Sequence, residues 1–117
     1  MAYAVKEGHE TLRERGAAPT EAVAIGGGAK SGLWRQILSD MLGIPLKTVE
    51  NVDSSLGSAM LAGVATGVFT GHADAVKRCV HVSGETRPDL EGVAFYQKQF
   101  GLYKEIEAAL APIYHKL

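Results

Sequence analysis

A run of three glycines followed by a lysine is the part of this sequence whose residue types could do chemistry. The glycines at 26–28 follow the apolar run 23–25, and Lys30 comes just before a segment with helical periodicity. Glycine adopts positive φ readily and has no Cβ, so bare backbone can approach a phosphate or a nucleotide. The first turn of a helix adds free N–H groups and a positive dipole end, worth about 0.3–1 kcal/mol for an anion. The segment therefore predicts a phosphate or nucleotide site.

Two common phosphate-binding motifs do not fit this run. A Walker A loop has Gly directly before its Lys, whereas Ala29 precedes Lys30 here. A dinucleotide fingerprint that starts at Gly26 meets Ser31 where its third glycine belongs. Short glycine runs also make plain turns. On spacing alone two interpretations stay open: a nucleotide site, and a tight strand-to-helix turn that serves packing.

The elements that must position the glycines follow from periodicity and from cap residues. Ser31 is expected to cap the helix that follows the glycines, and Asp53 or Ser54 is expected to cap the next one. Five helices are predicted, over residues 2–15, 32–42, 55–68, 72–79 and 93–110. Extended pieces are predicted over 22–26 and 46–49, and a polar loop over 82–91. The predicted fold class is α/β, rich in helix with one or two short strands.

Apolar residues on the first and last helices predict which faces pack inward. In the helix over 2–15 the expected face is Tyr3, Val5, His9 and Leu12. In the last helix it is Tyr96, Phe100, Tyr103, Ile106 and Leu110, which we expect to cover the core. The strand 22–26 is apolar on both faces, and a sheet with one further strand is too small to cover it. We therefore expect the isolated chain to expose apolar surface and to self-associate, by pairing or exchanging strands between copies.

Two strings of residues resemble one known family. Residues 25–43, IGGGAKSGLWRQILSDMLG, closely resemble part of the C-terminal domain of the FGGY carbohydrate kinases, and most of all xylulose kinases. Residues 56–63, LGSAMLAG, resemble the small-residue helix found downstream in that family, although Ser55 and Ser58 stand where alanines are usual. The Pro88 loop and the tyrosines of the last helix look like the family's C-terminal end. Together these stretches cover nearly the whole chain.

The resemblance implies a fold, an extent and an activity. The fold would be part of an actin-like, ribonuclease H-like ATPase domain. FGGY kinases are several times longer, so residues 1–117 would be a fragment of the C-terminal nucleotide-binding domain without an internal boundary. The full-length protein would transfer a phosphoryl group from MgATP to a ketopentose, D-xylulose, giving xylulose 5-phosphate. The alternatives are another sugar or polyol such as gluconate, glycerol or ribulose, a nucleotide-binding module without chemistry, and a purely structural piece.

The resemblance also implies which residues contact the nucleotide, with ATP and Mg as cofactors. They are Gly26, Gly27, Gly28, Ala29, Lys30, Ser31, Gly32 and Trp34. Gly27, Gly28 and Ala29 would pass under the α-phosphate and ribose. Ser31, Gly32 and Trp34 would border the adenine, and Lys30 would reach the phosphates. A Gly28→Val side chain should then clash with the nucleotide. The family's catalytic aspartate and sugar-binding residues would lie upstream, so no catalytic residue is assigned and the isolated chain is predicted to be inactive.

Composition excludes several classes of partner and site. The formal net charge is −1 without a basic run, so nucleic acid is not expected as a partner. Apolar stretches are broken by Gly or charge well short of a membrane span, and residues 1–7 lack a signal-peptide layout. The single cysteine, Cys79, cannot form an internal disulfide, which fits the cytoplasm. The scattered histidines lack metal-ligand spacing, and Asp40 has no partner acid, so we expect no metal site and a structural role for Asp40.

Overall fold

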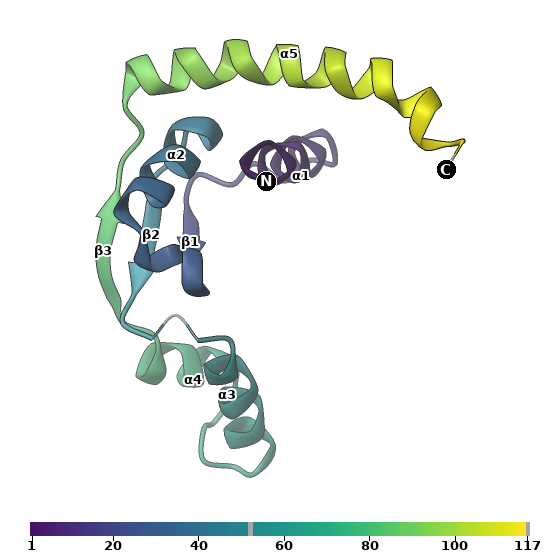
Figure 1. Cartoon of the computed structure of the whole chain (residues 1–117). Coiled ribbons are helices and arrows are strands. Elements are labelled where there is room, and N and C mark those ends of the chain that lie inside the picture. Colours follow the sequence, from purple (N-terminus) through teal and green to yellow (C-terminus); the bar gives the residue numbers. More distant parts are fainter. Residues whose placement is uncertain (52, 117) are drawn as a thin grey trace.

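The chain folds into a C-shaped molecule with a small sheet near its middle (Figure 1). The computed structural model describes residues 1–51 and 53–116. In order, the elements are α1 (Ala2–Glu14), β1 (Ala22–Ala24), the 3₁₀ turn η1 (Gly27–Lys30), α2 (Gly32–Leu42), β2 (Leu46–Val49), α3 (Ser55–Ala65), α4 (His72–Cys79), β3 (Val82–Thr86) and α5 (Leu90–Tyr114). Helix α5 spans one end of the C, with α1 and α2 beside it, and α3 and α4 form the other end.

The sheet has three strands in the order β1-β2-β3. β1 and β2 run parallel, with Ala22 opposite Leu46, and the crossover between them is made of η1 and α2. β3 runs antiparallel to β2, with Gly84 opposite Thr48. The predicted loop over 82–91 is therefore wrong for residues 82–86. Because β3 lies at an edge of the sheet with most of its side chains exposed, it does not need the apolar alternation by which strands are recognised.

The helix that follows the glycines begins and ends where the sequence predicted. α2 begins at Gly32, where the Oγ of Ser31 accepts a hydrogen bond from the backbone N–H of Trp34 at 3.3 Å. It ends at Leu42, because Gly43 takes the left-handed conformation, φ +70°, that closes a helix. Both ends depend on neighbouring residues alone, so the sequence was sufficient to predict them.

Two other helices differ from their predicted bounds by three residues or more. α3 ends at Ala65 rather than at residue 68, because the backbone N–H groups of Val68 and Phe69 turn back to the carbonyl oxygen of Gly63. α5 begins at Leu90, three residues earlier than predicted, because Asp89 caps it by accepting a hydrogen bond from the N–H of Gly92 at 3.1 Å. It then continues through Pro112 to Tyr114. Within the described ranges, no helix is both long and apolar enough to cross a membrane.

The inward face of α1 differs from the predicted one. Val5 and Leu12 are 44% and 53% exposed, whereas Ala2 and Lys6 are buried. The Nζ of Lys6 lies 5.5 Å from the ring centre of Phe100 on α5 and pairs with Glu10 at 3.5 Å. An aromatic ring can attract the ammonium group of a lysine while the carbon stem packs against apolar neighbours. Lys6 can therefore be buried on the inward face of α1, which the pattern of apolar residues did not predict.

Helix α5 packs on α1 through aromatic rings and one ion pair. The Tyr3 ring stacks on Tyr103 with centres 5.0 Å apart, and the Nζ of Lys104 lies 2.5 Å from a carboxylate oxygen of Glu7. The predicted apolar stripe of α5 is half-buried at Tyr96, Phe100, Tyr103 and Leu110, but Ile106 is 50% exposed. No described residue of α5 is fully buried, so this helix covers other helices rather than a deep core.

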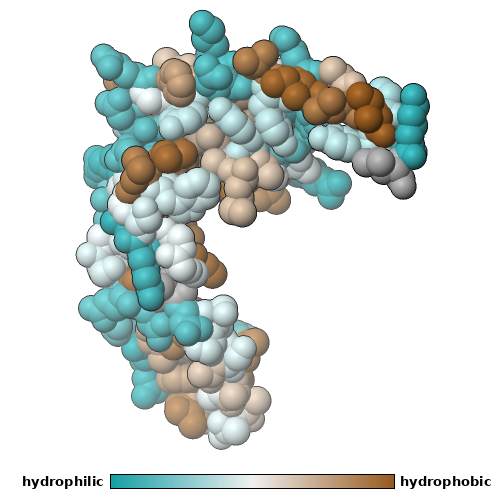
Figure 2. All heavy atoms as spheres, in the orientation of Figure 1, coloured by the Kyte–Doolittle hydropathy of each residue, from teal (hydrophilic) through white to brown (hydrophobic). Residues whose placement is uncertain are grey.

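The molecule is more open than a compact domain of its length. Its radius of gyration is 17.6 Å, whereas about 13 Å is typical of a compact chain of this size. Its accessible surface is 8072 Å², against about 6,100 Å² for an ordinary monomer of the same mass. Val23 and Ile25, which the sequence places in a strand needing cover, are 52% and 63% exposed. Figure 2 shows further apolar atoms gathered along the C-terminal half of α5.

Candidate functional site

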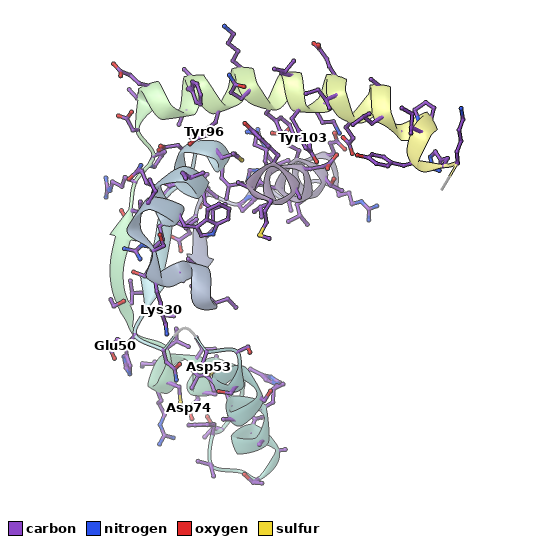
Figure 3. All side chains as sticks on the ribbon, viewed as in Figure 1. Lys30, Glu50, Asp53, Asp74, Tyr96 and Tyr103 are labelled. Atoms are coloured by element: carbon purple, nitrogen blue, oxygen red, sulfur yellow. The ribbon has the colours of Figure 1, made fainter. Side chains whose placement is uncertain are left out.

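A crevice of about 510 Å³ opens between the glycine turn and the start of α3. Gly26, Gly27 and Lys30 form its glycine wall. Its acidic wall comes from the segment after β2, namely Glu50, Asn51, Asp53 and Ser54. Figure 3 shows Lys30 between the glycine turn and the Glu50 and Asp53 side chains. The crevice lies at the carboxyl ends of two parallel strands, which is where ligands bind to open α/β sheets.

The glycine wall presents bare backbone to the crevice. Gly26 has φ +80°, a conformation that favours glycine, and it turns the chain from β1 into η1. A Cβ added at Gly26 or Gly27 would meet no atom within 4 Å among residues 1–51 and 53–116, so these glycines leave open space beside their backbone. The turn is held by the N–H of Ala29, which donates to the carbonyl oxygen of Gly26 at 3.1 Å. A phosphate could therefore approach the backbone here without meeting a side chain.

Gly28 faces a different neighbour. A Cβ at this position would lie 3.0 Å from the indole ring of Trp34, which is half-buried on α2. The Arg35 guanidinium donates from Nη1 to the carbonyl oxygen of Ala29 at 2.6 Å, and Ala29 is buried. A Gly28→Val side chain would therefore first displace the Trp34 ring, so it cannot serve as a clean probe of a nucleotide in the crevice.

The structure separates the eight residues expected at the site into two groups. Three of them line the crevice: Gly26, Gly27 and Lys30. The other five build the turn and the start of α2: Gly28, Ala29, Ser31, Gly32 and Trp34. Sequence reasoning missed the acidic wall. The acidic wall could have been found from its position directly after β2, since parallel strands bring their carboxyl ends to the same edge of a sheet.

Asp53 is held in place at the acidic wall. Its Oδ1 accepts a hydrogen bond from the N–H of Ser55 at 2.9 Å, which closes a turn at the start of α3, and its own N–H donates to Oδ1 of Asn51 at 3.0 Å. The hydrogen bond from Ser55 lowers the pKa of Asp53 below its ordinary value, and the positive charge of Lys30 contributes in the same direction. The crevice therefore carries a fixed carboxylate on one wall and an ammonium group on the other.

Comparison with known proteins identifies relatives that share this region. The sequence profile of the FGGY family of carbohydrate kinases, C-terminal domain, matches residues 1–66, which include both walls of the crevice. An autoinducer-2 kinase of Escherichia coli is 40% identical over 80 residues, covering 68% of this chain and 15% of that protein. A xylulose kinase of Bacillus subtilis is 30% identical over 107 residues, covering 91% of this chain and 21% of that protein. The chain thus spans about a fifth or less of the length of these curated relatives.

The fold leads to the same family. The crystal structure of ligand-bound xylulose kinase from Lactobacillus acidophilus matches with a TM-score of 0.86 at 28% identity, covering 98% of this chain and 24% of that chain. The structural neighbours are sugar kinases of the actin-like ATPase fold, which confirms the predicted fold class. The profile covers more than half of the residues and the structural match nearly all of them. The chain therefore belongs to the FGGY family of carbohydrate kinases.

Proposed function

We propose that this chain is the C-terminal part of the nucleotide-binding domain of a sugar kinase, and that its crevice holds an adenine nucleotide. The observation that carries the proposal is the glycine wall, where bare backbone and Lys30 meet at the carboxyl ends of two parallel strands. The whole protein would transfer the γ-phosphoryl group of ATP to a hydroxyl of a ketopentose, D-xylulose, to give xylulose 5-phosphate.

The chain's share of this reaction is positioning. In phosphoryl transfer a protein mainly orients the reacting groups and balances charge. Gly26 and Gly27 would let a phosphate lie against the backbone, and the Lys30 ammonium group would offset its charge. Mg²⁺ neutralises charge on nucleotide phosphates, and it is usually held by one or two carboxylates together with those phosphates. The glycine wall, where the phosphates would lie, offers no carboxylate among its residues, so the Mg²⁺ ligands and the base that accepts the sugar's proton are assigned outside this chain.

The sugar is proposed from the relatives, and two candidates stand out. The xylulose kinase relative covers most of this chain, which favours D-xylulose. The autoinducer-2 kinase relative is more identical over a shorter stretch, which makes autoinducer-2 the second candidate. A panel of D-xylulose, autoinducer-2, gluconate, glycerol and ribulose should be tested for sugar-dependent ATP consumption with the longest protein that carries this chain. Turnover fastest with D-xylulose would support the proposal, and consumption independent of any sugar would contradict it.

The exposed surface supports two further parts of the proposal. The excess of accessible surface over a compact monomer, about 1,900 Å² by the scaling of monomer surface with mass, is the area that the rest of a kinase would cover. Without that cover we propose that copies of the chain self-associate at β1, whose outer edge pairs with no strand among the described residues. Light scattering of the isolated chain should show dimers or larger species, and a stable monomer would contradict this.

We also propose a cytoplasmic location, where ATP is available and Cys79 stays reduced.

A further inference from the structure

The two walls of the crevice carry opposite charge. The glycine wall contributes the ammonium group of Lys30, and the acidic wall contributes the carboxylates of Glu50 and Asp53. A nucleotide is itself polar, with anionic phosphates at one end and a sugar rich in hydroxyl donors in the middle. The charge of the walls therefore restricts how such a ligand can lie.

The phosphates can approach one wall only. A diphosphate placed against Glu50 and Asp53 would face two carboxylates, which repel it and offer it no donor. The same diphosphate placed against Gly26 and Gly27 meets open backbone and the charge of Lys30. The phosphates are thus directed to the glycine wall, and the part of the ligand that faces Asp53 must be a hydrogen-bond donor.

The acidic wall suits a pair of sugar hydroxyls. A carboxylate can accept about four hydrogen bonds, and the bond from the N–H of Ser55 at 2.9 Å occupies one of these positions on Asp53. That hydrogen bond restrains the carboxylate, so less side-chain entropy is lost when a ligand binds. Asn51 accepts from the N–H of Asp53 through Oδ1, which leaves its NH₂ group as a donor at the same wall.

We propose, building on the nucleotide site proposed above, that Asp53 binds the ribose hydroxyls of the nucleotide while Lys30 and the glycine wall hold its phosphates. The ligand class is then a ribonucleoside di- or triphosphate in one orientation. Ribose recognition is separate from phosphate recognition in this arrangement, so the two can be measured independently.

An Asp53→Asn variant removes the charge and keeps the fold. The Oδ1 of asparagine can accept the same hydrogen bond from the N–H of Ser55, so the turn at the start of α3 is kept. Asp74 provides a matched control, because its carboxylate likewise accepts a hydrogen bond from a backbone N–H, that of Thr70 at 3.1 Å, and it lies on α4 outside the crevice (Figure 3). The Asp74→Asn variant therefore makes the same chemical change away from the site.

Calorimetric titration of ADP and 2′,3′-dideoxy-ADP into the chain and its variants tests the proposal. The wild-type chain should bind ADP about tenfold more tightly than the dideoxy analogue, as expected for loss of a charge-assisted hydrogen bond. This ratio should fall to about one in Asp53→Asn and persist in Asp74→Asn. Lys30→Met should weaken both nucleotides by the same factor and leave the ratio unchanged.

The outcomes separate this proposal from the one on which it rests. If ADP binds and Asp53→Asn leaves the ratio unchanged, the ribose assignment is overturned while the nucleotide site stands. If the wild-type chain binds no ADP at millimolar concentration, both are overturned. Pyrophosphate supplies the remaining check: Asp53→Asn should bind it as well as the wild type or better, and weaker binding would place Asp53 at the phosphates instead.

Discussion

The helical layer of α1, α2 and α5 and the crevice at the glycine turn are built on opposite principles. In the helical layer, contacts are made by side chains that are present, such as the stacked rings of Tyr3 and Tyr103. In the crevice the important feature is side chains that are absent, at Gly26 and Gly27. Removing atoms should therefore damage the first region, and adding atoms should damage the second.

The largest effect is expected at Asp40, which ties α2 to the start of α5. Its Oδ1 accepts hydrogen bonds from Nε2 of Gln36 at 2.8 Å and from the N–H of Asp89 at 2.7 Å, and it is buried. Asp40→Ala should lower the free energy of unfolding by about 3 kcal/mol, because the N–H of Asp89 loses its charged acceptor. Chemical denaturation measures this. A loss below about 0.5 kcal/mol, the usual limit for surface substitutions, would show that Asp40 does not hold the layer together.

A somewhat smaller effect is expected at the aromatic contact between α1 and α5. Tyr103→Ala removes a half-buried ring that stacks on Tyr3, and it should lower the free energy of unfolding by about 2 kcal/mol. Tyr114, which is 61% exposed, supplies the control: Tyr114→Ala should change stability by less than about 0.5 kcal/mol. If both variants lost the same free energy of unfolding, the contact of Tyr103 with Tyr3 would contribute no more to stability than the exposed Tyr114 side chain does.

The crevice should respond in the opposite sense. Gly27→Val adds a side chain where no described residue has an atom within 4 Å of the added Cβ, so the folded state should be little affected while ADP affinity falls at least about tenfold. Gly8→Val makes the same change on α1, where the added Cβ also meets nothing, and it should leave ADP binding unchanged. If Gly27→Val bound ADP normally, the open backbone would be a turn and nothing more.

The smallest effect concerns pH and belongs to the helical layer. Burial lowers the pKa of His9 below its ordinary value of 6.5, and the charges of Lys6 and Arg13 add to this shift. The unfolded chain therefore takes up the proton first as the pH falls, and stability should decline below about pH 6.5. In His9→Gln the difference in denaturation midpoint between pH 7.5 and pH 5.5 should shrink. His72→Gln, which changes an exposed side chain on α4, should keep the wild-type difference.

How much of the molecule the sequence could predict depends on the distance between interacting residues. α2 was predicted at both ends because Ser31 and Gly43 act within one turn of their helix. β3 was missed because its evidence is a partner strand more than thirty residues away, and its own residues are mostly exposed. A polar segment becomes a strand there through backbone pairing with β2, which composition does not reveal.

In the candidate site, too, the wall that depends on neighbouring residues could be predicted and the wall that depends on distant ones could not. The glycine wall could be predicted because three glycines beside Lys30 are informative in themselves. The acidic wall could not, because Glu50 and Asp53 face the glycines only once β1 and β2 pair in parallel. In α1 the apolar pattern failed since Lys6, a charged residue, is buried against Phe100. Prediction from local sequence therefore failed in two cases: where strands distant in the sequence pair, and where a charged side chain packs through its carbon stem.

Trp34 gives the glycine turn a spectroscopic signal of its own. It is the sequence's single tryptophan, and its indole ring lies against Gly28 within the turn. All tryptophan fluorescence of the chain therefore comes from one position beside the crevice. A ligand that settles on the turn would alter the polarity around this ring and shift its emission without any attached label, whereas a ligand bound elsewhere would leave the spectrum unchanged.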